Sequence, residues 1–192
     1  MNAKTYPMNR KQTGFTLVEL MITLLIAAIL LSQAVPSFLT MLQNSRITTQ
    51  ANDYVTSLNV ARSEAVKRGS RITVCKSTNN TTCIASGGWQ QGWIIFVDAD
   101  NDAVVDNGEE VLRAHGPFEP GNTLVGTGNT ANYISFIGSG FSQLTNGGVQ
   151  NGELVMCDNR GFGSNARAII LSASGAVRTV PADDATVVAT LC

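Results

Sequence analysis

One acidic residue, Glu19, lies inside an apolar stretch of the chain that runs from Phe15 to Val35. An ionised carboxylate inside a bilayer costs several kcal/mol unless a partner neutralises it, so such a residue indicates a function. If the chain were cut after Gly14, the new α-amino group of Phe15 would lie one helical turn from Glu19. We therefore expect this amine, from the same chain or from a neighbouring one, to pair with the carboxylate.

The apolar stretch itself is long enough to cross a membrane. Taken as a helix from Phe15 to Val35, it is about 30 Å long, which matches the hydrocarbon core of a bilayer. Lys4, Arg10 and Lys11 precede it and no basic residue follows it immediately, which predicts a cytoplasmic N-terminus. The rest of the chain then lies across the membrane, which in a Gram-negative cell means the periplasm.

The helical pattern continues beyond the membrane stretch, which argues against a secretory signal peptide. Apolar residues recur mostly at spacings of three and four at Phe38, Leu39, Leu42, Ile47, Ala51, Tyr54, Leu58, Ala61 and Ala65. The pattern predicts one long helix that ends near Lys67, Arg68 and Gly69, where basic residues and a glycine favour termination. Pro36 lies inside this helix and should kink it or melt one turn.

The four cysteines, Cys75, Cys83, Cys157 and Cys192, all follow the membrane stretch. An even number of cysteines in an exported domain indicates two disulfides, with three possible connectivities. A bond between Cys75 and Cys83 is favoured because the intervening loop is short, and Cys157 would then pair with Cys192. Metal binding by the thiolates is disfavoured because the chain has no Cys-x-x-Cys spacing.

A second acidic pattern occupies the middle of the chain. Asp98, Asp100, Asp102 and Glu109 stand at positions one, three, five and twelve of a calcium-binding loop of the EF-hand type. Position six is Ala103, where the sharp turn of such a loop requires glycine, and the flanking segments are predicted strands rather than helices. A solvated turn between two strands is therefore favoured over a metal site.

The chain offers no convincing catalytic set. His115 is its only histidine, and the cysteines are expected to be paired, so neither a Ser-His-Asp nor a Cys-His arrangement can be built without that one ring. His115 precedes Gly116 and Pro117 and is interpreted as a loop residue. We expect no enzymatic activity, no cofactor and no metal.

Three arginines near the C-terminus raise the question of DNA binding. Arg160, Arg167 and Arg178 could form one patch that contacts phosphates, since the last two are expected on adjacent strands. Removal of Lys4, Arg10 and Lys11 with a leader would leave ten basic residues of the original 13 against 14 acidic ones, a net charge of −4. DNA is thus a disfavoured partner, and the alternative is that these arginines pair with Asp158, Asp183 and Asp184.

After Gly69 the pattern changes from helical to strand-like. Short β-branched or aromatic segments are separated by Gly, Asn and Ser, and they cover residues 71–75, 92–97, 110–113, 132–137, 152–156, 167–171 and 176–180. The pattern predicts an α+β fold in which the long helix packs on one mainly antiparallel sheet or on two small sheets. The expected divisions are a leader at 1–14, a membrane helix at 15–36, an amphipathic helix at 37–69 and a β-rich domain at 70–192.

The segment Gly14-Phe15-Thr16-Leu17-Val18-Glu19 resembles the type IV prepilin signature. The resemblance implies that a prepilin peptidase cuts between Gly14 and Phe15 and methylates the new N-terminus. It also implies that Glu19 acts in filament assembly and that the fold is pilin-like. The helix that follows, with its proline at Pro36, is similar to that of the same family.

The later part of the chain resembles the GspH/FimT group of minor pilins and pseudopilins. The segments that carry this resemblance are 89–98, 108–113, 136–140 and 168–178. The resemblance implies an inner-membrane minor pilin that takes part in priming or in the tip of a type IV pilus, with other minor and major pilins as partners. It leaves open two alternatives, a type II secretion pseudopilin like GspH and a DNA receptor for uptake like FimT. The FimT branch carries a Gly-Arg-x-Arg motif, whereas Ala176 stands at the first arginine here.

Overall fold

A computed structural model of the chain describes residues 14–183 and Cys192. The chain forms two compact units, Met1–Leu42 and Gln43–Cys192. Except for Gly14, the expected leader lies outside the described residues, and so does Asp184.

One helix, α1 (Leu17–Arg68), contributes to both units. Its first part contains an 18-residue window with a mean hydropathy of 2.2 and no buried residue, so by length and composition it could cross a membrane. The helix continues through Pro36 without interruption, so the melted turn that was one expected consequence of this proline does not form. The hydroxyl of Thr40 donates a hydrogen bond of 3.1 Å to the carbonyl of Pro36.

In the globular unit, α1 buries one stripe of side chains and then ends where the sequence predicts. The buried residues recur at alternating spacings of four and three: Ile47, Ala51, Tyr54, Leu58, Ala61 and Ala65. After Arg68, Gly69 adopts a φ of 64° and its N–H donates to the carbonyl of Ala65 at 2.9 Å. This left-handed residue terminates the helix, as glycine commonly does.

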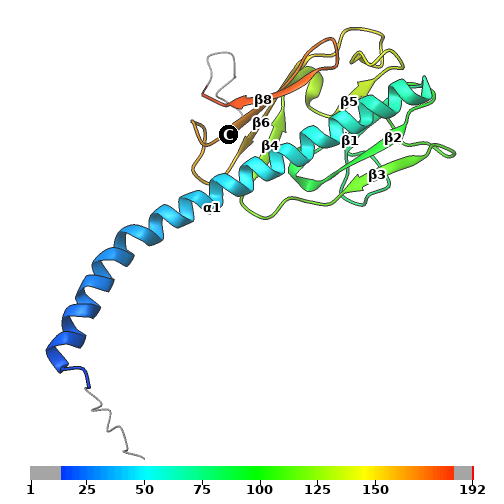
Figure 1. The fold of residues 1–192 in the computed structure, drawn as a ribbon. Helices are drawn as coiled ribbons and strands as arrows, with labels where there is room; N and C mark the ends of the chain where they lie inside the picture. Colours follow the sequence, from blue (N-terminus) through cyan, green and yellow to red (C-terminus); the bar gives the residue numbers. More distant parts are fainter. Residues whose placement is uncertain (1–13, 184–191) are drawn as a thin grey trace, which may run out of the picture. The chain divides into compact units, whose positions relative to one another are not determined.

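Two antiparallel four-stranded sheets, with orders β3-β2-β1-β5 and β4-β6-β7-β8, pack against this stripe (Figure 1). The strands are β1 (Ile72–Lys76), β2 (Trp93–Val97), β3 (Val111–His115), β4 (Thr123–Gly126), β5 (Tyr133–Phe136), β6 (Gly152–Cys157), β7 (Arg167–Leu171) and β8 (Val177–Pro181). The predicted α+β class is confirmed, and all seven expected strands are present. The sequence did not predict β4, nor the two short 3₁₀ helices η1 (Trp89–Gln91) and η2 (Gly128–Thr130).

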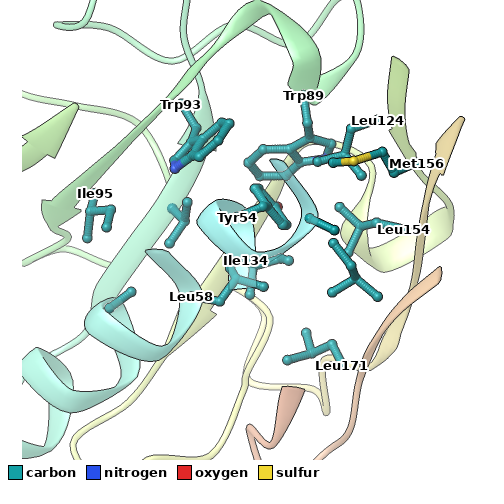
Figure 2. Packing of buried hydrophobic residues seen from close by; sticks show 14 of the residues in the cluster. Tyr54, Leu58, Trp89, Trp93, Ile95, Leu124, Ile134, Leu154, Met156 and Leu171 are labelled. Carbon is teal, nitrogen blue, oxygen red and sulfur yellow. The ribbon is translucent and has the colours of Figure 1, made fainter. Parts of the chain in front are cut away.

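The centre of the core is aromatic. Tyr54 of α1 contacts the indole rings of Trp89 and Trp93 edge to face, with ring centroids 5.3 and 5.0 Å apart (Figure 2). Ile134 from one sheet and Leu154 from the other lie in the same cluster. The stripe of α1 is therefore enclosed by both sheets and holds them together.

A buried glutamine closes an edge of the first sheet. The side chain of Gln150 is fully buried; its Oε1 accepts a hydrogen bond from the N–H of Ser135, and its Nε2 donates to the carbonyls of Tyr133 and Asn129, each at 2.8 Å. The amide thus occupies the position of a neighbouring strand beside β5, whose backbone groups would otherwise be buried without partners.

Two disulfides attach Cys83 and Cys192 to these sheets. Cys75 of β1 is bonded to Cys83, and Cys157 of β6 is bonded to Cys192, with Cα–Cα separations of 5.6 and 5.9 Å. The structure thus has the favoured connectivity, and the last residue of the chain is attached to the second sheet. Each bond of this kind typically contributes about 2–4 kcal/mol.

We predict that Tyr54→Phe leaves the free energy of unfolding unchanged or raises it by about 1 kcal/mol. The hydroxyl of Tyr54 is fully buried and has no hydrogen-bond partner among the described residues, and burial raises its pKa well above the ordinary value. Thermal unfolding followed by tryptophan fluorescence would measure the change. The control is Tyr133→Phe, because the Tyr133 hydroxyl accepts a hydrogen bond from the N–H of Thr145 at 3.1 Å. A clear loss of stability in Tyr54→Phe but not in the control would contradict the prediction.

Candidate assembly site and charged surfaces

Thr16 positions Glu19 at the start of α1. The N–H of Glu19 donates to the hydroxyl of Thr16 at 3.2 Å, and the N–H of Leu20 donates to the carbonyl of Thr16 at 3.1 Å. Thr16 is therefore the N-cap of the helix, and Thr-x-x-Glu is the spacing of a capping box. Thr16 was not among the functional residues predicted from the sequence, although this spacing could have identified it.

Glu19 has no cation near it in its own helix. The first basic residue after Gly14 is Arg46, which is 27 residues from Glu19 and so about 40 Å away along a helix. Phe15, immediately before the cap, is 84 % exposed. Cutting the chain after Gly14 would place the new amine at Phe15, four residues before Glu19, which is the spacing that the expected pairing requires. Neither the cut nor the pairing is tested by the structure, and both stay predictions.

The acidic pattern forms a closed loop between β2 and β3. Oxygens of Asp98, Asp100 and Asp102 lie within 4.8 Å of one another. Ala103 adopts a φ of 62°, so the sharp turn forms with alanine at the position where an EF-hand loop has glycine. The loop is flanked by strands, as expected.

Hydrogen bonds from β1 and from the loop's own backbone already use several of its carboxylates. Buried Asp98 accepts from the hydroxyl of Thr73 at 2.6 Å, and Glu109 accepts from the backbone N–H groups of Ala99 and Asp106 at 2.7 and 3.1 Å. The nearby charge of Asp102, together with some desolvation, raises the pKa of Asp106. The loop thus holds like charges close together through its own backbone.

The three arginines do not form one patch. In the register of β7 and β8, Arg167 faces Pro181 whereas Arg178 faces Ile170, so the two arginines lie on opposite faces of the sheet. The guanidinium of Arg160 donates to Asp158, with a closest separation of 2.6 Å, which agrees with the ion-pair alternative for this residue. The single patch expected from the sequence is therefore wrong, because the strand register separates Arg167 from Arg178.

His115 is a strand residue and not the loop residue that the sequence suggested. It ends β3 opposite Trp93, and the two rings stack with centroids 4.0 Å apart and an interplanar angle of 5°. Phe118 contacts Trp93 edge to face, with centroids 5.4 Å apart. His115 therefore extends the aromatic core to the edge of the first sheet.

Comparisons with known proteins agree with this architecture. The family model of the type II transport protein GspH matches residues 50–175, and that of the prokaryotic N-terminal methylation motif matches residues 9–32. The type IV minor pilin FimU of Pseudomonas aeruginosa has a similar fold, with a TM-score of 0.52 and 20% identity over 71% of this chain and 90% of FimU. The minor pseudopilin EpsH of the Vibrio cholerae type 2 secretion system has a TM-score of 0.49 and 11% identity, over 72% of this chain and 99% of EpsH. No curated protein matches the chain.

We predict that Asp106→Asn stabilises the domain at neutral pH. Because Asp102 and its neighbours raise the pKa of Asp106, ionised Asp106 is less favourable in the folded chain than in the unfolded one. This penalty is fully present when the pH is above the raised pKa of Asp106 in the folded chain. It disappears as the pH falls below the pKa of Asp106 in the unfolded chain. The melting temperature of the variant should therefore exceed that of the parent at pH 7 and converge with it under acid conditions.

The matched control is Asp53→Asn, which removes an exposed carboxylate of α1 outside the loop. Equal effects of the two substitutions at both pH values would show that net charge, and not the arrangement of the loop, causes the change.

Proposed function

This chain belongs to the GspH family of type II transport proteins, and on that premise we propose that it is a minor pilin that takes part in priming or in the tip of a type IV pilus. The observation that carries the proposal is the acidic Glu19 at the capped start of a helix whose first part is apolar and exposed, with no basic residue in that helix before Arg46. The likeness to FimU supports the fold on which this role depends.

Processing would come first. A prepilin peptidase cuts between Gly14 and Phe15 and methylates the new N-terminus, and the match to the N-terminal methylation motif supports this step. Before assembly, the apolar part of α1 anchors the chain in the inner membrane and the globular domain lies in the periplasm. The two disulfides support an oxidising compartment of this kind.

Assembly then depends on matching a buried charge. When the apolar helices of several subunits pack together, Glu19 lies in a medium of low dielectric, where an unpaired carboxylate is costly. The amine of Phe15 in a neighbouring subunit neutralises it only if the two helices are in the correct register. The pair therefore selects the position at which the subunit enters the filament, and the role is structural rather than enzymatic.

We predict that Glu19→Ala abolishes incorporation of the chain into the filament. The helix and its apolar surface remain, but the group that fixes the register is lost. Immunoblots of sheared filaments and of inner membranes would measure the distribution, and the variant should be cut normally but remain in the membrane fraction. Thr23→Ala is the matched control, since Thr23 is the next polar residue of the same helix and its hydroxyl donates to the carbonyl of Leu20 within that helix. Normal incorporation of Glu19→Ala would refute the proposed role of the carboxylate.

The DNA-receptor alternative yields a different expectation. Arg167 and Arg178 lie on opposite faces of the sheet, and Arg160 is paired with Asp158. We therefore predict that changing Arg167 and Arg178 to Gln alters the fraction of DNA bound by the full-length protein in gel shifts by less than about twofold. A salt-sensitive complex that both substitutions abolish would favour the receptor.

A secretion pseudopilin is the remaining alternative. A pilus and a pseudopilus would use the same helix and the same carboxylate, so deletion of the gene is the informative experiment. Loss of pili with normal secretion supports the proposal, and loss of secretion with normal pili supports the pseudopilin.

A further inference from the structure

Four large apolar side chains are exposed among the described residues of the globular unit, and they form what we call the apolar pole. They are Val66, Val104, Phe141 and Val149, with exposed fractions of 54, 49, 53 and 61 %. Single exposed apolar residues are normal on a protein surface, whereas a group of them at one place marks an interaction site.

The topology brings these four residues to one end of the domain. Ile72, the first residue of β1, pairs with Val97 at the end of β2 and with Phe136 at the end of β5. The loop 98–110, which holds Val104, and the loop 137–151, which holds Phe141 and Val149, therefore leave the first sheet at the same end. The last turn of α1, which holds Val66, directly precedes β1 there (Figure 1).

Two arginines hold the parts of this end together. Arg71 donates to Asn101 at 2.7 Å and to the side chain and carbonyl of Gln143, each at 2.8 Å, and so joins the two loops. Arg62 donates from α1 to the carbonyls of Gly140 and Ser174 at 2.9 and 3.0 Å. A surface ordered in this way loses little conformational freedom when it binds a partner.

The part of the pole around Phe141 and Val149 is concave and has no charged lining residue. The groove there is lined by Ile137, Phe141, Ser142, Gln143, Gly147, Gly148, Val149 and Ala173. Gly140, next to Phe141, has a φ of 81°, and a side chain at Gly175 would collide with its carbonyl. The loop that holds Phe141 thus approaches the turn at Gly175 closely.

One side of the pole is strongly acidic. The loop 98–110 contains six acidic residues and no Lys or Arg: Asp98, Asp100, Asp102, Asp106, Glu109 and Glu110. Only Glu110 forms an ion pair among the described residues, with Arg68 at 2.7 Å. A second copy that approached with the same pole would bring like charges together, whereas a basic partner would relieve their repulsion.

We propose that the apolar pole docks a neighbouring pilin-family subunit whose contacting face carries apolar side chains flanked by Lys or Arg. The proposal rests on the assignment of the chain as a pilin subunit and names the surface and the chemistry of one of its contacts. Apolar residues of the partner enter the groove beside Phe141, and its basic residues face Asp100, Asp102 and Asp106.

The test is photo-crosslinking of the full-length chain in cells that also make its neighbouring pilin-family proteins. A benzophenone amino acid replaces Phe141 or Val149, and the control position is Thr81, an exposed residue of the loop that follows β1 at the opposite end of the first sheet. We expect products from Phe141 and Val149 but not from Thr81, and mass spectrometry should identify a partner with its own prepilin signature. A product that is a second copy of this chain, or equal products from all three positions, would overturn the proposal.

The charge requirement is tested in the same strain. Asp102→Asn combined with Asp106→Asn should lower the yield of the Phe141 product by about threefold, because charges at the rim of an interface assist association. Asp53→Asn serves as the control and should leave the yield unchanged. An undiminished yield in the double variant would show that the partner is not selected by basic residues.

A fourth crosslinking position separates this proposal from the proposed function. A benzophenone at Leu24 reports contacts of the apolar helix in the assembled filament. Products from Leu24 without products from Phe141 would refute the docking surface alone. Absence of products from both positions would refute assembly into a filament as well.

Discussion

The fold depends on the contact between the buried stripe of α1 and both sheets. Tyr54 lies between Trp89 and Trp93, while Ile134 and Leu154 approach the same stripe from different sheets (Figure 2). Each large apolar side chain that is buried contributes about 1.5–3 kcal/mol. Because one helix covers the inner faces of both sheets, neither sheet could move without exposing these residues. The buried backbone of β5 also needs hydrogen-bond partners, because water cannot reach it. The side-chain amide of Gln150 supplies them at Tyr133 and Ser135.

The local patterns predicted the helix, its end at Gly69 and seven of the eight strands, because periodicity and glycine caps act over a few residues. Long-range pairing decided the rest. The strand β4 has four residues, and its extended form comes from its register with β6, which no local pattern specifies. The separation of Arg167 from Arg178 has the same origin: a shift of one residue in the β7–β8 register would have placed both on one face. His115 was misassigned because Gly116 and Pro117 suggest a loop, whereas its stacking on Trp93 is a tertiary contact.

Most cations of the globular unit are satisfied within it. Lys76 is only 2 % exposed and donates to the carbonyls of Ala85 and Gly87 and to the side chain of Asn132; its burial lowers its pKa. Arg62 and Arg71 donate chiefly to carbonyls of distant loops, so they hold these loops in place. These side chains serve the architecture and leave little positive charge for nucleic acid, which agrees with the net acidic composition of the chain.

Unlike the cations, two sets of carboxylates have no basic residue in their own segment, and both are candidates for contacts with other subunits. Glu19 and the acidic loop both lack cations of their own, but they lie in different media. In an apolar helix bundle an ionised Glu19 is costly unless it is neutralised, so in the proposed filament its pairing would decide whether a subunit can be accommodated. The exposed carboxylates of loop 98–110 remain in water, where their repulsion is screened and weak, so in the proposed contact they would only favour one neighbour over another. In the assembly proposed above, the stringent requirement would therefore belong to the helix and the selective requirement to the loop.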